Sequence, residues 1–184
     1  MGLPLSPIVA GMWRLREWRL DTPALARWIE QALELGITSF DHADLYGDYG
    51  AEAAFGAALA ASPGLRGRMQ LVTKCGIKLV SPVRPSHAIK SYDSSRAHVL
   101  ASVENSLRAL ATDRIDLLLI HRPDWLAEPD ELARSFEELH RAGKVLHFGV
   151  SNHTPSQFAL LHRRFALATN QIEFSPLRLA ALSD

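Results

Sequence analysis

Hydrophobic residues in this chain occur in short apolar runs, separated by longer stretches in which they recur with helical spacing. The short runs lack a strict alternation of apolar and polar residues, which is typical of strands buried on both faces of a sheet. We expect six strands, at Ile8–Met12, Ile37–Phe40, Gln70–Thr73, Ile115–Ile120, Val145–Val150 and Leu167–Ile172. Successive runs are far enough apart for a loop and a covering helix, so the pattern predicts parallel strands.

The stretches between these runs contain the start and stop signals of helices. Thr22 followed by Pro23 predicts an N-cap with a proline at the first helical position, and Gly36 predicts the end of that helix. Further helices are expected after Ser95, before Gly143, after Thr154, and over the alanine-rich segment Glu52–Ala60, which we expect to be closely packed. Residues 77–96 have few apolar periods and predict a long loop, long enough to be a functional loop over the mouth of the site.

This order of elements predicts a parallel α/β protein, either a closed barrel or an open doubly wound sheet. No Gly-x-Gly-x-x-Gly follows the first strand, so a Rossmann nucleotide site is not indicated. A complete (β/α)₈ barrel usually needs about 250 residues. The 184 residues hold about six of eight βα units, so we expect one domain over residues 1–184 that is incomplete at its C-terminal end.

Composition excludes several classes of partner. Twenty basic and 20 acidic residues give zero formal net charge, so we expect neither nucleic acid nor an anionic membrane surface as a partner. No apolar run approaches the roughly 20 residues needed to span a bilayer. The one cysteine, Cys75, cannot form an internal disulfide, and the first residues do not resemble a secretion signal. These observations predict a cytoplasmic protein.

Four chemically active side chains stand at the ends of successive predicted strands. Asp41 and Tyr46 follow the second strand, Lys74 follows the third, and His121 follows the fourth. Taken singly, each has an ordinary structural interpretation, such as a turn residue for Asp41 or a satisfied core residue for His121. Because the C-terminal ends of parallel barrel strands share one face, their joint occurrence favours an active site.

The four residue types suit proton donation to a carbonyl group. A free phenol has a pKa near 10, and a lysine ammonium about 4 Å away would favour the phenolate. We therefore expect Lys74 to lower the pKa of Tyr46, and Asp41 to form the ion pair that keeps Lys74 charged. His121 could then donate a hydrogen bond to an incoming carbonyl oxygen. Such a site would lack only a hydride carrier for carbonyl reduction.

Five motifs in order resemble the signatures of the aldo-keto reductases, and within them the YdhF-type bacterial oxidoreductases. They are Phe40–Gly47, Leu71–Cys75, Ile115–Pro123, Gly149–Asn152 and Asn170–Pro176. The resemblance covers essentially the whole chain. It implies a (β/α)₈ TIM barrel of the aldo-keto reductase type, which binds NADPH and reduces a small aldehyde or ketone.

The resemblance also implies a role for each site residue. Tyr46 would be the general acid, Lys74 and Asp41 would lower its pKa, and His121 would orient the carbonyl. Met12 and Trp13, at the end of the first strand, would line the mouth of the site, with Met12 as a cofactor-binding residue and Trp13 as a wall of the substrate pocket. The residues expected to bind the nicotinamide carboxamide are Ser151, Asn152 and Gln171. The family's basic residues after strands seven and eight have no counterparts here, so we expect weak NADPH binding.

Two other functions remain open on the sequence. A metal-dependent hydrolase could use His42, Asp44, Lys74 and His121, but the first strand has no His-x-His pair, so we predict no metal site. A regulatory or inactive reductase-like scaffold is the second alternative. The sequence has no signal for the natural substrate or for the oligomeric state.

Overall fold

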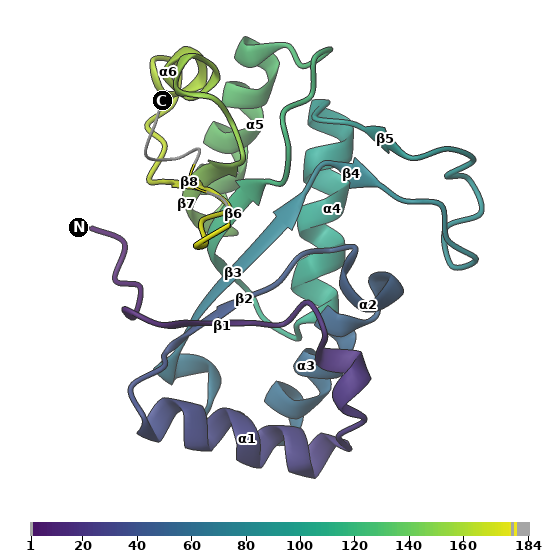
Figure 1. The fold of residues 1–184 in the computed structure, drawn as a ribbon, viewed down its shortest axis with the longest axis vertical. Helices are drawn as coiled ribbons and strands as arrows, with labels where there is room; N and C mark the ends of the chain where they lie inside the picture. The colour runs from purple at the N-terminus through teal and green to yellow at the C-terminus, as the bar shows by residue number, and fades with distance from the viewer. Residues whose placement is uncertain (1, 178, 180–184) are drawn as a thin grey trace.

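The core of the protein is a parallel sheet that curves as part of a barrel. A computed structural model describes residues 2–177 and 179 (Figure 1). The sheet has six strands in the order β1-β2-β3-β6-β7-β8, and every neighbouring pair is parallel. The strands are β1 (Val9–Gly11), β2 (Ser39–Asp41), β3 (Gln70–Cys75), β6 (Ile115–Ile120), β7 (Val145–Ser151) and β8 (Asn170–Gln171). All six predicted strands are confirmed, and their spatial order follows their order in the chain.

Five helices cover the outer face of this sheet (Figure 1). They are α1 (Thr22–Glu34), α3 (Ala51–Ala61), α4 (Arg96–Ala109), α5 (Pro129–Arg141) and α6 (Pro155–His162). Each of these helices contacts the next one, from α1 to α6, so they form a continuous outer layer. Shorter turns are η1 (Leu15–Trp18), α2 (Tyr46–Tyr49) and η2 (Arg66–Arg68). In the part of the chain that the structure describes, no helix is long and apolar enough to cross a bilayer.

Helix starts follow the predicted capping signals with one correction. The N-cap of α1 is Asp21, whose carboxylate accepts a hydrogen bond from the Ala24 amide at 2.8 Å. Thr22 is the first helical residue and not the cap, because Asp21 already occupies the extended position before the helix. Ser95 and Thr154 cap α4 and α6 as predicted, and Thr154 forms a capping box with Gln157.

Side chains alternate between the two faces of each strand and pack in different cores. Outer-face residues such as Phe40 and Phe148 pack beneath the helices. Inner-face residues form a smaller cluster of Val72, Leu117 and Leu119, against which Leu3 and Leu5 pack. The position of a residue within its strand therefore decides whether it stabilises the helical layer or faces the barrel interior.

Helix α3 approaches α4 closely, as its alanine content predicts. A Cβ atom at Gly56 would lie 1.9 Å from the carbonyl oxygen of Ala109, which is far too close for any side chain. This glycine lets the two backbones touch.

The segment between β3 and α4 contains two strands that the sequence analysis missed. β4 (Ile77–Lys78) and β5 (Ser91–Tyr92) pair in an antiparallel manner outside the main sheet. Two-residue strands are too short to show periodicity, which explains why this segment resembled a plain loop.

Candidate active site

A cleft of about 780 Å³ opens at the C-terminal ends of the parallel strands. Asp41 is the last residue of β2, Lys74 lies in β3 and His121 follows β6 directly. Lys74 shares the inner-face parity of Val72, which directs it away from the helical layer. The predicted site residues that line the cleft are Trp13, Asp41, Tyr46, Lys74, His121, Ser151, Asn152 and Gln171.

The ammonium of Lys74 lies at the centre of this site. Its Nζ atom donates to both carboxylate oxygens of Asp41, at 2.7 and 2.6 Å, and to the hydroxyl oxygen of Tyr46 at 3.2 Å. It also donates to the backbone carbonyl of His42 at 2.9 Å. The lysine side chain is 2% exposed, so the charge is almost fully removed from water. The structure thus brings Asp41, Lys74 and Tyr46 into direct contact.

The electrostatic environment of Tyr46 differs from the sequence prediction. Burial raises the pKa of Tyr46 far above its usual value, and the carboxylates of Asp41 and Asp44 raise it further. The expected net lowering of this pKa is therefore wrong for this structure, because burial and the two carboxylates outweigh the hydrogen bond from Lys74. Asp41 pairs with Lys74 through both oxygens and offsets its positive charge, while burial also lowers the pKa of Lys74 itself. The phenol is consequently fully protonated at neutral pH.

His121 is neutral and has one ring nitrogen available. Burial lowers its pKa to about 3, with further contributions from Lys74 and Arg122. Its ring lies edge-on to that of Tyr46, with the centroids 5.9 Å apart. Among the described residues, its Nδ1 atom is buried without a hydrogen-bond partner, which leaves Nε2 as the nitrogen able to meet a ligand. A neutral imidazole at this position can donate one hydrogen bond.

The two predicted mouth residues after β1 behave differently. Trp13 lines the cleft and is 64% exposed. Met12 is completely buried and packs in the outer core with Phe40. The prediction that Met12 lines the mouth of the site is therefore wrong. The reason is the alternation along the strand, which places Met12 on the same side as Ala10 and away from the barrel interior.

Three polar side chains line the cleft at the ends of β7 and β8. Asn152 adopts a left-handed conformation, with φ 58°, and its amide nitrogen donates to the hydroxyl of Ser151 at 2.8 Å. Ser151 pairs in register with Gln171 of the next strand. Within the described chain, the side-chain amide of Gln171 forms no hydrogen bond, so it is free to bind a ligand.

The loop predicted over residues 77–96 forms one wall of the cleft. Ile77, Leu79, Lys90 and Tyr92 line it, and all four come from the segment that includes β4 and β5. The length of the loop predicted this position over the site, whereas the residues that it would contact had no signal in the sequence. In the described residues, no three His, Cys, Asp or Glu side chains are grouped as metal ligands would be.

Comparison with known proteins agrees with this geometry. Residues 7–183 match the model of the family described as "Aldo/keto reductase family". The chain belongs to the aldo/keto reductase family. This family assignment confirms the resemblance inferred from the five motifs, and the partial (β/α)₈ barrel agrees with it.

Three similar proteins place this aldo/keto reductase in more detail. It is 52% identical over 185 residues to oxidoreductase YdhF of Escherichia coli K12, covering all of this chain and 61% of that protein. It is 47% identical over 178 residues to 6-dehydroglucose reductase of Agrobacterium fabrum, covering 95% of this chain and 60% of that protein. The solved structure of glycerol dehydrogenase from Gluconobacter oxydans superposes with a TM-score of 0.85 at 33% identity, covering 100% of this chain and 56% of that one. The chain thus spans about three fifths of the length of the curated relatives.

Proposed function

We propose that this aldo/keto reductase uses NADPH to reduce a small aldehyde or ketone to an alcohol, with Tyr46 as the general acid. The observation that supports this most strongly is the set of hydrogen bonds from Lys74 Nζ to Asp41 and to Tyr46 inside a cleft shared with His121. The names of two relatives, 6-dehydroglucose reductase and glycerol dehydrogenase, favour a polyhydroxylated substrate. The single cysteine is consistent with a reaction in the cytoplasm.

The residues at one end of the cleft fit the carboxamide of a nicotinamide. A carboxamide has one acceptor oxygen and a donor NH₂ group, and Ser151, Asn152 and Gln171 present both hydroxyl and amide groups. The unpartnered side-chain amide of Gln171 would gain hydrogen bonds from such a ligand. When bound there, NADPH supplies the hydride for the reduction.

The protein's own residues would supply the proton for the reduction and stabilise the charge that its transfer leaves. Tyr46 Oη donates its proton to the carbonyl oxygen as negative charge develops there. Lys74 already donates to Tyr46 Oη, so it stabilises the phenolate that this transfer leaves behind. Asp41 holds Lys74 in place through both oxygens. His121 donates a hydrogen bond to the same carbonyl oxygen and orients it.

The Tyr46→Phe variant tests this assignment. With DL-glyceraldehyde as the carbonyl compound, we expect the rate of NADPH consumption to fall about 10²- to 10⁴-fold, the usual contribution of a general acid. The dissociation constant of NADPH, followed by tryptophan fluorescence, should stay unchanged, and binding is expected to be weak enough to need high NADPH concentrations. Trp125→Phe is the control, because Trp125 is 87% exposed and does not line the cleft.

Each alternative outcome has a distinct meaning. Full turnover by Tyr46→Phe would refute the role of this residue. A wild-type chain that binds NADPH but consumes none with any carbonyl compound would support the scaffold alternative. Activity that disappears in EDTA would instead favour a metal-dependent reaction.

A further inference from the structure

The turn that follows Tyr46 has an unusual backbone. Gly47, Asp48 and Tyr49 have φ values of 58°, 56° and 60° in succession. Left-handed conformations are uncommon in residues other than glycine, and two such residues in a row require contacts that hold them. The side chains of Asp48 and Tyr49 provide these contacts, and both reach the same distant segment.

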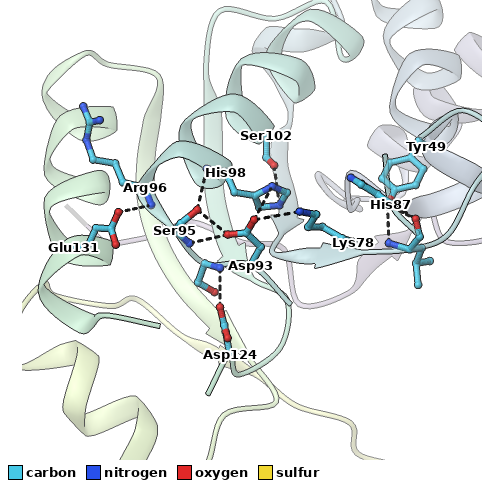
Figure 2. A network of polar contacts seen from close by, with 12 residues as sticks. Tyr49, Lys78, His87, Asp93, Ser95, Arg96, His98, Ser102, Asp124 and Glu131 are labelled. Atoms are coloured by element: carbon cyan, nitrogen blue, oxygen red, sulfur yellow. Dashed lines mark hydrogen bonds and ion pairs between the residues drawn. The ribbon is translucent and has the colours of Figure 1, made fainter. Parts of the chain in front are cut away.

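That segment is residues 77–92, which we call the β4–β5 flap. Tyr49 Oη accepts a hydrogen bond from the Leu79 amide at 2.9 Å. His87 Nδ1 lies 3.4 Å from the same Oη atom and 3.1 Å from the Leu79 carbonyl oxygen. Figure 2 shows His87 beside Tyr49. The Arg84 guanidinium lies 4.9 Å from the centre of the Tyr49 ring. Tyr49 is thus the point to which the far part of the flap is fixed.

Asp48 provides a second attachment next to the first. Its carboxylate accepts a hydrogen bond from the Ser81 hydroxyl at 2.5 Å, and Ser81 is buried. Both attachments start within three residues of Tyr46. The general acid and the flap are therefore connected through one short turn.

The base of the flap is fixed separately, at the start of α4. Lys78 pairs with Asp93 at 3.4 Å, and Asp93 accepts hydrogen bonds from both the amide and the hydroxyl of Ser95, the N-cap of α4 (Figure 2). His98 of α4 lies 3.9 Å from Asp93. The base thus does not depend on Tyr49, and loss of Tyr49 Oη should release only the part between β4 and β5.

The flap meets the cleft on the side away from the carboxamide-binding residues. Leu79 and Tyr92 line the cleft together with Tyr46 and His121. The flap follows β3, whereas Ser151 and the polar groups next to it lie on β7 and β8, beyond β6 in the sheet. A ligand that touches Leu79 and Tyr92 is therefore the carbonyl compound rather than the nicotinamide.

We propose that Tyr49 is a positioning residue that holds the β4–β5 flap over the cleft, and that Leu79 and Tyr92 of the flap determine which carbonyl compounds bind. The flap contributes an aliphatic chain and an aromatic ring, and Trp13 adds a second aromatic ring to the same cleft. Such surfaces suit the C–H faces of a short polyhydroxylated aldehyde or ketone. This inference rests on the proposed function for the identity of the ligand, but the attachment itself can be tested without turnover.

The test compares the wild-type chain with Tyr49→Phe, which removes one oxygen atom and keeps the ring. Hydrogen–deuterium exchange should become faster in the flap, most clearly at the Leu79 amide, and stay unchanged in α4. The KM for DL-glyceraldehyde should rise about twofold to tenfold, the value of one or two net hydrogen bonds. Both kcat and the NADPH dissociation constant should stay within about twofold of wild type, since the flap does not touch the nicotinamide side. Arg68→Gln is the control, because it removes an exposed contact with Glu30 of α1, away from the flap and from α4.

The outcomes separate this inference from the proposed function. Unchanged flap exchange, or an NADPH affinity that falls as much as the glyceraldehyde affinity, would overturn the role of Tyr49. If the wild-type chain shows no turnover, the proposed function fails, and the flap is then judged by exchange alone. DL-glyceraldehyde should slow flap exchange in wild type but less in Tyr49→Phe, and no protection in wild type would overturn the inference. If Tyr49→Phe does not fold, Ser81→Ala removes the second attachment and should change the same quantities in the same direction.

Discussion

Replacing Asp41 by asparagine should destabilise the fold strongly at neutral pH. Asp41 is the carboxylate that accepts two hydrogen bonds from Lys74, whose side chain is 2% exposed. In Asp41→Asn the buried ammonium loses the carboxylate that contacts it, although the amide oxygen still accepts one hydrogen bond. The variant therefore isolates the charge of Asp41 with little change in shape.

The size of the effect follows from the burial of the ion pair. Removing one partner of a buried pair costs about 3–5 kcal/mol, and the remaining hydrogen bond favours the lower end, about 3 kcal/mol. With a urea dependence of about 2 kcal/mol per molar, the unfolding midpoint should fall by about 1.5 M. Asp113→Asn is the control, since Asp113 is 84% exposed and its pair with Arg114 should contribute less than about 1 kcal/mol.

The pH dependence provides the sharper part of this prediction. Burial lowers the pKa of Lys74 below its ordinary value of 10.5, and Asp41 opposes that shift. Without Asp41 the folded-state pKa falls further, so the unfolded chain binds this proton more tightly than the folded chain. Stability then increases as the pH rises from the folded-state pKa to the unfolded value, and the deficit relative to wild type should shrink between about pH 7 and about pH 10.

Urea unfolding followed by tryptophan fluorescence at both pH values measures this deficit. A second variant, Asp41→Asn with Lys74→Met, removes both charges and should recover part of the lost stability at about pH 7. An equal deficit at both pH values, or no recovery in the double variant, would show that the buried charge of Lys74 is not the cause.

Three further predictions follow from the described contacts. Gly56→Ala should destabilise the fold by about 3 kcal/mol or more, because its Cβ would collide with the Ala109 carbonyl oxygen. A urea unfolding midpoint equal to that of wild type would contradict this close approach. Cys75 should resist a thiol reagent until the chain unfolds, because burial raises its pKa well above the ordinary value, and rapid labelling of the folded protein would argue against this burial. The pH profile of kcat/KM should show no step near pH 6.5 from His121, because the pKa of this residue is about 3. A step near pH 6.5 that disappears in His121→Ala would refute the neutral imidazole.

The sequence predicted the fold best where apolar runs were longest. The bounds of β6 agree with the prediction, since six consecutive residues of this strand are mostly apolar and buried. The strands β4 and β5 were missed, because two residues form no periodic pattern. Met12 was misplaced because the resemblance located it only at the end of the first strand, whereas its parity in the strand decides which face it occupies.

The residues of the site were predictable, but their electrostatics were not. Strand ends and motif order predicted that Tyr46, Lys74 and Asp41 meet, and the structure brings them together. The direction of the Tyr46 pKa shift depends on burial and on how completely Asp41 offsets Lys74. Burial and charge compensation both depend on the packing of the three-dimensional site, so the spacing of residues along the chain cannot predict them.

The alternation of faces along β3 separates chemistry from stability within two consecutive residues. Thr73 is buried toward the helical layer, where its hydroxyl donates to Glu52 at 2.6 Å, and Glu52 also accepts from Ser106 at 2.9 Å. Lys74, the next residue, lines the cleft and donates a hydrogen bond to Tyr46 Oη. Mutations on the helical side of the strand can therefore change the thermal stability of the fold, while mutations on the other side change the cleft. An engineer can screen the two sets of positions as independent libraries.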